Sequence, residues 1–236
     1  MLRFYISLFF LFAISIGYAK TQNNDTIEKF GIRAGVDLNK IIKSATTEDY
    51  KGLSINADIR IKESLYIFSE LGNEEKKINT YYLNSNIKGT YLKVGLNFKL
   101  NNDIKSENIV YSGFNIGYSN FEQTINNFTI YNTNSSTWGE ATSYDSIALS
   151  KLNALWFEFV FGLKTEIFNN LFLGFELQLK SVVKQKIKND ISNFYIPGFN
   201  RTYDSSKLGA GFNYTISYLI PVVKKEYHFF VFLLPG

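Results

Sequence analysis

Apolar and polar residues alternate with a period of two along much of this chain, most clearly between Leu208 and Ile220. In that segment apolar and aromatic residues occupy every second position, and most of the intervening positions are glycine or small and polar. Such alternation is typical of a β-strand, in which successive side chains point to opposite faces. We predict eight strands from this pattern, at residues 29–38, 51–61, 64–73, 90–100, 109–119, 153–167, 171–182 and 207–220.

The polar face of the predicted strands carries nearly all of their charge. Away from the strand ends the apolar face has no charged residue, whereas the opposite face holds six cations and six anions. A Lys or Arg on the lipid face of a membrane barrel costs about 2–4 kcal/mol near mid-membrane, so a spanning barrel requires this segregation. The predicted lumenal charge network consists of Arg33, Asp37, Asp58, Arg60, Glu70, Lys93, Lys99, Glu158, Lys164, Glu166, Glu176 and Lys180.

These features predict an all-β protein, an eight-stranded antiparallel up-and-down transmembrane β-barrel with a packed polar lumen. Most of the segments reach the roughly 9–11 residues that a tilted spanning strand needs. Eight strands enclose an interior just wide enough for side chains, so we expect ion pairs in the lumen and no open channel. The alternative is a secreted soluble ligand-binding barrel, which would crowd many Phe and Leu side chains into that small interior.

The connections between the predicted strands alternate in length. Bacterial membrane barrels have short periplasmic turns and long external loops. The order of connections therefore predicts a protein of the cell outer membrane with both termini in the periplasm. The short turns lie at 62–63, 101–106 and 169–170, and the long loops at 39–50, 74–89, 120–152 and 183–206.

The N-terminus has the pattern of a secretory signal peptide. Arg3 precedes an apolar run from Phe4 to Ile16, and small residues follow up to Ala19. The run is too short for a spanning helix, which needs about 20 residues, so we favour a signal peptide over a membrane anchor. We predict three parts: a signal peptide at 1–19, the barrel domain at 20–225, and an apolar C-terminal tail of unknown role at 226–236.

Composition excludes several kinds of chemistry. The chain has no cysteine, so it forms no disulfide and no thiolate metal site. Its formal net charge is +4, or +3 once Arg3 is removed with the signal peptide. This charge is too small to indicate a nucleic-acid-binding protein. The one histidine, His228, lies in the tail, where nothing places it near a catalytic or metal site. We therefore predict no cofactor, no metal and no nucleic-acid partner.

The charges of the lumen allow two interpretations. Carboxylates such as Glu158 and Glu166 perform acid–base catalysis when they are positioned against a substrate. Alternatively, the charges form a structural network, because an unpaired buried ion is costly. The equal number of cations and anions favours the structural network, and we predict that the protein is not an enzyme.

Two loops are the best places for an interaction with another molecule. Loops longer than about a dozen residues are usually functional or disordered. Loop 120–152 mixes polar residues with aromatic ones that could bind a partner or glycan, but we favour the alternative, a hairpin that extends two strands above the membrane and binds no ligand. In loop 183–206 we expect the aromatic residues to lie in the interfacial girdle rather than over the barrel mouth. The candidate surface-binding residues of loop 120–152 are Phe128, Tyr131, Trp138 and Tyr144.

Several sequence blocks resemble an uncharacterised family of outer-membrane β-barrels from Bacteroidota-type bacteria, a domain of unknown function. The resemblance covers about residues 28–225 and implies the same barrel fold. The family has no assigned activity, so it implies no functional residue. The blocks are Tyr50-Lys51-Gly52, Leu155-Trp156-Phe157-Glu158 through Phe172-Leu173-Gly174-Phe175, Tyr195-Ile196-Pro197-Gly198-Phe199, and Gly211-Phe212-Asn213-Tyr214-Thr215-Ile216-Ser217-Tyr218.

The sequence thus predicts an outer-membrane β-barrel protein with a non-enzymatic structural or surface-interaction role. The alternatives are an accessory factor in secretion or envelope assembly, a lipid-modifying outer-membrane enzyme, and the secreted ligand-binding barrel. The partners that we expect are outer-membrane lipid, the barrel-assembly machinery during biogenesis, and an extracellular or periplasmic protein.

Overall fold

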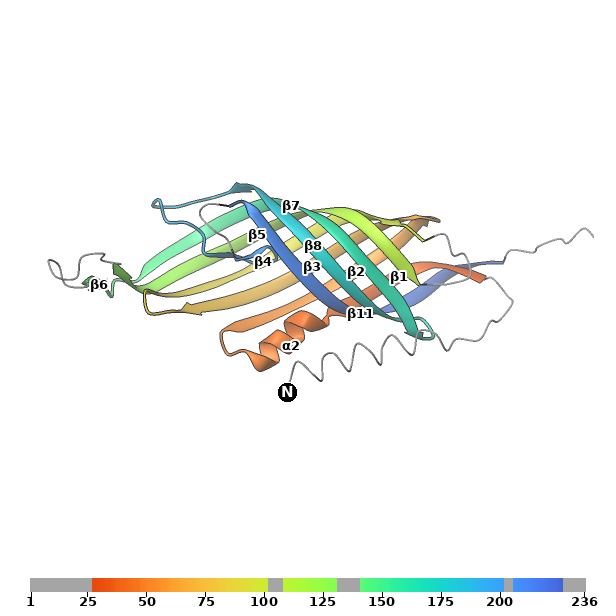
Figure 1. Cartoon of the computed structure of the whole chain (residues 1–236), viewed down its shortest axis with the longest axis horizontal. Helices are drawn as coiled ribbons and strands as arrows, with labels where there is room; N and C mark the ends of the chain where they lie inside the picture. Colours follow the sequence, from red (N-terminus) through yellow and green to blue (C-terminus); the bar gives the residue numbers. More distant parts are fainter. Residues whose placement is uncertain (1–26, 102–107, 131–140, 202–205, 227–236) are drawn as a thin grey trace, which may run out of the picture.

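Eight long antiparallel strands close into a barrel (Figure 1). The computed structural model describes residues 27–101, 108–130, 141–201 and 206–226. Each long strand pairs with its neighbours along the chain, and the last strand pairs with the first, so the sheet has no open ends. The barrel strands are β1 (Ile27–Asp37), β2 (Tyr50–Lys62), β3 (Leu65–Asn79), β4 (Leu83–Lys99), β5 (Ile109–Ile130), β7 (Ile147–Phe168), β8 (Leu171–Gln185) and β11 (Leu208–Glu226).

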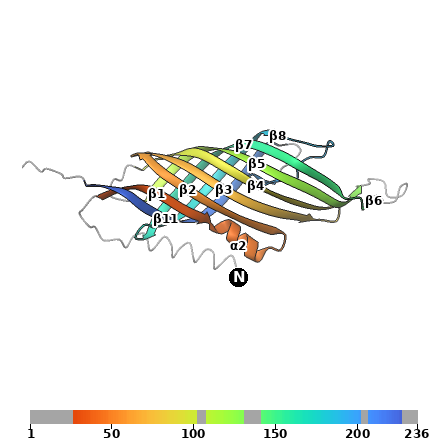
Figure 2. The same cartoon turned by 180° about the vertical axis from the view of Figure 1, so that it is seen from behind.

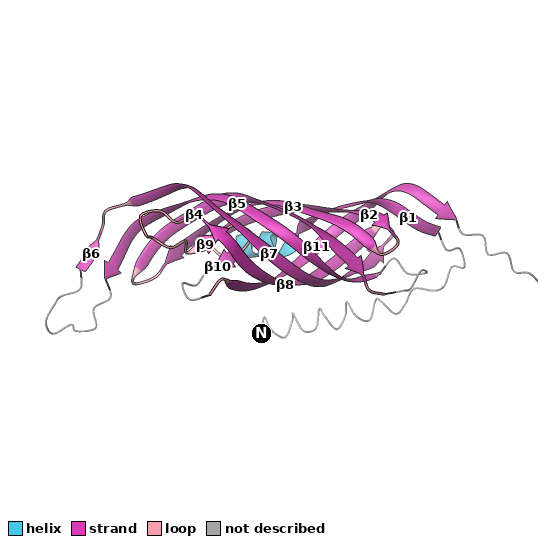
Figure 3. Ribbon diagram, turned by 90° about the horizontal axis from the view of Figure 1, so that it is seen from above, coloured by secondary structure: helices cyan, strands magenta, loops and turns pink. Residues whose placement is uncertain are grey.

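Four short elements accompany the barrel. Helix α2 (Leu38–Thr46) joins β1 to β2, and Figures 1 and 2 both place it along the side of the barrel. Strand β6 (Ala141–Ser143) extends the sheet beside β5, and β9 (Tyr195–Ile196) pairs with β10 (Asn200–Arg201) near one end of the barrel (Figure 3). No helix in the described part of the chain is long and apolar enough to cross a membrane.

The outer face of the barrel is apolar and the inner face is charged. Phe114 and Leu179 on the outer face are each 63% exposed, whereas Lys93 and Glu158 on the inner face are each 1% exposed. Soluble proteins bury residues in the opposite way, with apolar side chains inside and charges outside. The prediction of an eight-stranded antiparallel up-and-down barrel with a packed polar lumen is confirmed.

A row of alternating charges interrupts the apolar outer face on four adjacent strands. Lys51, Glu75, Lys88 and Glu122 lie opposite one another in register, and the ammonium of Lys88 is 2.9 Å from the carboxylate of Glu122. Opposite charges on neighbouring strands stabilise a sheet modestly. On β4, the outward residues from Thr90 to Phe98 are uncharged, and that segment has the length that a tilted spanning strand needs. The charge row therefore marks one border of the apolar band.

Two of the predicted loops, 74–89 and 39–50, are wrong because regular structure replaces most of each. The predicted loop 74–89 is a tight hairpin, since β3 runs to Asn79 and β4 starts at Leu83. For loop 120–152 the favoured interpretation, a hairpin that extends two strands, agrees with the structure, because β5 runs to Ile130 and β7 starts at Ile147. The predicted loop 39–50 contains helix α2. Beyond the charge row both faces of the strands are polar or mixed, so the alternation that identified the strands ends before the strands do.

Glycines on the inner face provide space for aromatic rings. A Cβ atom on Gly117 would lie 2.2 Å from a ring carbon of Trp156, which is 0% exposed. A Cβ atom on Gly72 would likewise lie 2.4 Å from the ring of Tyr91. Glycine is therefore required at these positions by the close approach of a ring to the neighbouring strand.

We expect Gly117→Ala to lower the free energy of unfolding by about 1–3 kcal/mol, the usual cost of overpacking. Gly211→Ala is the matched control, because its Cβ would meet its nearest atoms, the flexible ends of Gln178 and Lys180, at 3.3 Å. Urea unfolding of the purified protein in detergent micelles measures both variants. Equal stability of the two would contradict the role of Gly117 as the space for Trp156.

Candidate functional site: the charged lumen and the barrel mouth

One group of charges surrounds Asp58 inside the barrel. The guanidinium of Arg33 donates to Asp58 at 2.8 Å, and the ammonium of Lys164 pairs with the other oxygen of that carboxylate. The Arg33 guanidinium also lies 5.1 Å from the ring centres of Tyr66 and Phe172, within the range of cation–π attraction. Both cations are thus held by one anion and by aromatic faces.

Glu176 lies in the same part of the lumen and is held by neutral donors. The Tyr111 hydroxyl donates to it at 2.8 Å and the Gln178 amide at 2.6 Å. Among the described residues no cation lies within ion-pair distance of Glu176. Its two donors satisfy one oxygen each, as a buried carboxylate requires.

A second and larger group of charges is centred on Lys40, which enters from helix α2. Its ammonium lies 2.9 Å from Asp37, 3.0 Å from Glu70 and 3.7 Å from Glu74. Asp37 also caps the helix, because its carboxylate accepts from the backbone of Asn39 at 2.9 Å. One lysine of the helix thus connects the end of β1 to two carboxylates of β3.

The Lys40 group continues across the lumen to β8. Lys93 lies 3.6 Å from Glu70 and 3.1 Å from Glu158, and Lys180 lies 3.5 Å from Glu158. The Trp156 indole donates to Glu158 at 2.8 Å. We call this connected set, from Asp37 to Lys180, the Lys40 network.

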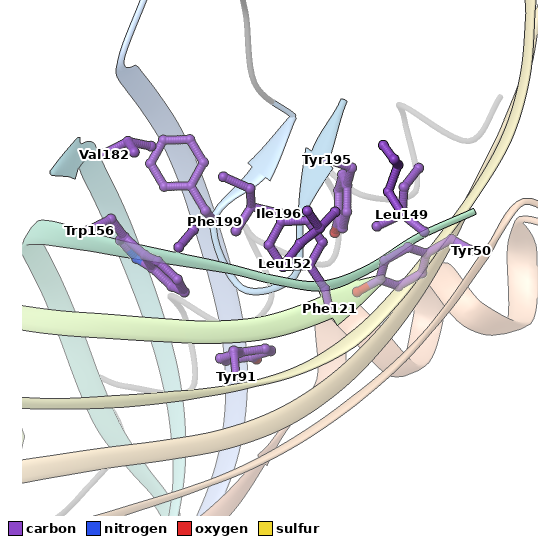
Figure 4. Packing of buried hydrophobic residues seen from close by; sticks show 12 residues of the cluster. Tyr50, Tyr91, Phe121, Leu149, Leu152, Trp156, Val182, Tyr195, Ile196 and Phe199 are labelled. Carbon is purple, nitrogen blue, oxygen red and sulfur yellow. The ribbon is translucent and has the colours of Figure 1, made fainter. Parts of the chain in front are cut away.

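The segment 192–200, which we call the mouth plug, closes one end of the lumen. Figure 4 shows Ile196 and Phe199 pointing in among Trp156, Leu152 and Tyr91. Ile196 is 0% exposed and Phe199 1%, and the Phe199 ring meets that of Trp156 edge-on at 6.0 Å between centroids. The expectation that the aromatics of loop 183–206 lie in the interfacial girdle is therefore wrong for Tyr195 and Phe199, because both are buried in the mouth.

The turn of the plug is built by Pro197 and Gly198. Phe199 donates its backbone N–H to Ile196 at 3.0 Å, and Gly198 has a φ of +82°, as a type II turn with proline first and glycine second requires. A Cβ on Gly198 would also lie 2.6 Å from the Tyr91 ring. Glycine is therefore required here both by the backbone conformation and by the lack of space.

Polar contacts join the plug to the Lys40 network and to the wall. Glu74 accepts from the Tyr195 hydroxyl at 2.5 Å and from the Gly198 N–H at 3.1 Å, and Lys180 donates to the Gly198 carbonyl at 2.9 Å. On the other side, the Gln123 amide group donates to the Ser192 carbonyl at 3.1 Å and accepts from the Phe194 N–H at 3.0 Å. The same charges that cross the lumen therefore hold the mouth closed.

The structure divides the twelve predicted network residues into two classes. Nine are buried and belong to the groups around Asp58, Glu176 and Lys40. The other three, which include Arg60 and Glu166, are half-buried near the opposite end of the barrel. There the Arg60 guanidinium donates to the Glu63 carbonyl at 3.1 Å, and Glu166 accepts from the Asn170 N–H at 2.8 Å. Lys99 is the third of these.

Sequence reasoning missed Lys40 and Glu74, because both were assigned to loops. Glu74 continues the inward series of Glu70 and Gly72, so an extension of the same alternation would have found it. Lys40 follows Asp37 by one helical turn, and an Asp before a helix is a common N-cap signal. Nothing in the sequence indicates that the lysine points into the lumen.

The candidate surface-binding residues lie away from the lumen or outside the described residues. Phe128 is half-buried in β5 and pairs with Leu83 and Ser143, whereas Tyr144 is 78% exposed just after β6. Tyr131 and Trp138 lie outside the described residues, as do the predicted signal peptide, the apolar tail and His228.

The arrangement of the lumenal charges is that of a structural network. Glu158 contacts two lysines and an indole, and Glu166 lies eight positions further along β7, which corresponds to about 26 Å in an extended strand. Two carboxylates so far apart do not act on one bond. Among the described residues no group of three His, Cys, Asp or Glu side chains could hold a metal ion.

Comparison with known proteins places the chain in a family. A domain of unknown function, DUF6048, matches residues 1–225, so the chain belongs to that family. The resemblance to an uncharacterised family is thereby confirmed, and the bacterial group stays a prediction. No curated protein matches the chain.

One solved structure is similar at a low level. It is the attachment invasion locus protein Ail of Yersinia pestis, with 8% sequence identity and a TM-score of 0.37, and the match covers 82% of this chain and 95% of that one. At this identity and TM-score we draw nothing about function from the likeness.

We expect Lys40→Met to lower the free energy of unfolding by about 3–5 kcal/mol, because it leaves the buried carboxylates Asp37, Glu70 and Glu74 without their shared cation. Lys88→Met is the control, since it removes a lysine from the exposed pair with Glu122, and exposed pairs contribute little. Urea unfolding in detergent micelles measures both. Equal and small losses would show that Lys40 does not organise the network.

Proposed function

We propose that this protein is a closed, non-conducting β-barrel of the outer membrane that acts without catalysis, through its mouth and the strand extensions around it. The single observation that carries the proposal is the inverted distribution of side chains, with apolar residues outside and paired charges inside. Leu92, Val94 and Leu96 are outward neighbours on β4 and are each more than 40% exposed, with the buried Lys93 between Leu92 and Val94.

A membrane is the environment in which this distribution is stable. Soluble monomers rarely expose contiguous apolar patches beyond a few hundred Å². In a bilayer the outer side chains contact acyl chains, and the pairing of the last strand with the first gives every long strand two neighbours. On β4, the segment from Thr90 to Phe98, between the charge row and the end of the strand, has the length of a membrane-spanning strand, and this also supports a membrane environment.

The connections support an orientation with both chain ends in the periplasm. Two residues join β2 to β3, and two join β7 to β8, at the end of the barrel from which β1 starts. The long extensions of β5 and β7 and the mouth plug lie toward the other end, and helix α2 follows the end of β1 on that side. Bacterial barrels keep short turns in the periplasm, so the plugged mouth would face outward.

The lumen supports a non-conducting role. The Lys40 network crosses it, and the buried side chains of the plug fill the mouth. The charged groups contact one another rather than a free space, which is also why we favour a non-enzymatic role.

The first test is the electrophoretic mobility of protein extracted from purified outer membranes. We expect unboiled protein to migrate differently from boiled protein, because a closed barrel resists denaturation by detergent. Phe159→Arg should abolish recovery from the membrane, since it places a cation on the outer face at a residue that is 41% exposed, and Phe159→Leu is the matched control. Recovery of wild type in the soluble periplasmic fraction would contradict the proposal.

Planar lipid bilayers test the non-conducting part. We expect the purified barrel to show no steady ionic current, because the plug and the Lys40 network occupy the lumen. A stable open-pore current from the wild-type protein would contradict this part and leave the membrane location intact.

A further inference from the structure

The barrel wall has a gap between β2 and β11 near the mouth. Strand β1 separates them only as far as Asp37, which lies opposite Thr215. Beyond that point, residues 208–214 of β11 pair only with β8, and residues 50–54 of β2 pair only with β3, among the described residues. Two strand edges thus face each other with no strand between them.

Helix α2 covers this gap. The Asn39 amide donates to the Phe212 carbonyl on the β11 edge at 3.2 Å. On the β2 edge, the Gly52 N–H donates to the Ser44 hydroxyl at 2.7 Å. Ile41 and Ile42 are 39% and 57% exposed, so the helix adds apolar side chains to the surface of the molecule. The wall is therefore closed here by side-chain contacts, in place of the continuous ladder that joins the other strands.

A cavity of about 880 Å³ adjoins the helix, the start of β11, the mouth plug and the end of β3. Its lining includes Ala210 and Phe212, which lie on the apolar outer face of β11, and Lys76, which lies on the inward face of β3. Residues from both faces of the sheet line this cavity because it lies beside the gap in the wall and at the rim of the mouth. The cavity thus joins the mouth of the barrel to its apolar outer surface.

The polar part of the cavity is cationic. Lys43, Lys76 and Lys77 line it together with one carboxylate, that of Asp49. None of the three lysines forms an ion pair with a carboxylate of the described residues, and the Lys43 ammonium lies 4.2 Å from the ring centre of Tyr50. Lys76 and Lys77 directly follow Glu75, so they lie just beyond the charge row that borders the apolar band.

We infer that this cavity binds the phosphorylated head group of a lipid, whose acyl chains lie along the outer face of β11 and α2. Lysine ammonium groups are point-charge donors to phosphate, and basic pockets beside an apolar membrane surface select anionic lipids. Asn39 and Asn200 add polar side chains to the lining of the cavity. The inference rests on the proposed membrane location, because only a lipid meets both the lysines and the outward Phe212.

Native mass spectrometry of the full chain released from detergent micelles tests the inference. The probes are phosphatidic acid, phosphatidylcholine with the same acyl chains, and inorganic phosphate. The test variant combines Lys43→Gln, Lys76→Gln and Lys77→Gln. The control combines Lys51→Gln, Lys184→Gln and Lys186→Gln, which removes the same charge from exposed lysines outside the cavity.

We expect wild type to bind one phosphatidic acid at least about tenfold more tightly than phosphatidylcholine, the difference that one charge-assisted contact makes. The test variant should lose that preference and the control should keep it, and excess inorganic phosphate should not displace the lipid. Equal binding of the two lipids, or a test variant that behaves as wild type, would overturn the inference. Displacement by phosphate alone would show a site for a soluble anion and overturn the lipid assignment.

The same samples separate this inference from the proposed function. A wild-type protein whose gel mobility does not change on boiling refutes the membrane barrel and the lipid site together. A normal mobility change with no preference for phosphatidic acid refutes the lipid site alone. Both triple variants must show the wild-type mobility change, which checks that they fold as barrels. If the test variant does not, the single change Lys77→Gln, at an exposed position, replaces it.

Discussion

The neutralisation of buried charge inside the barrel is the constraint on which the rest of the structure depends. A buried ion is stable only when it is paired and hydrogen-bonded. Asp58 on β2 and Lys164 on β7 lie on opposite strands of the ring, and their ion pair can form because the lumen of eight strands is narrow. The Lys40 network then extends from β1 to β8, so one set of contacts joins the wall, helix α2 and the mouth plug.

Helix α2 and the plug are best understood as parts of that network. The helix brings Lys40 to two carboxylates of β3, and the plug brings the Tyr195 hydroxyl and the Gly198 N–H to Glu74. Neither segment belongs to the closed ring of long strands. Each is held by polar contacts to the inner face and by apolar or aromatic packing, which explains how a barrel with a charged lumen closes both its mouth and the gap in its wall.

The sequence predicted the barrel well because the membrane imposes a simple rule on each strand. Outward residues such as Phe159 must be apolar, and inward residues such as Lys164 can be charged, so a period of two identifies the strands. The rule ends beyond the charge row, where Lys76 and Lys77 on opposite faces of β3 are both charged, and the predicted strands stopped before this region. The turn Ile196-Pro197-Gly198-Phe199 can be predicted from its proline and glycine. Its burial against Trp156 cannot, because it depends on contacts between strands that are far apart in the sequence.

Quenching of tryptophan fluorescence by brominated lipid tests most directly which face meets the membrane. The chain has two tryptophans, so Trp138→Phe leaves Trp156 as a probe of the lumen. In bilayers of brominated lipid we expect Trp156 to be only weakly quenched, and a tryptophan added by Phe159→Trp, on the outer face, to be strongly quenched. Strong quenching of Trp156, with an unquenched tryptophan at position 159, would mean that the apolar face points inward and would contradict the account.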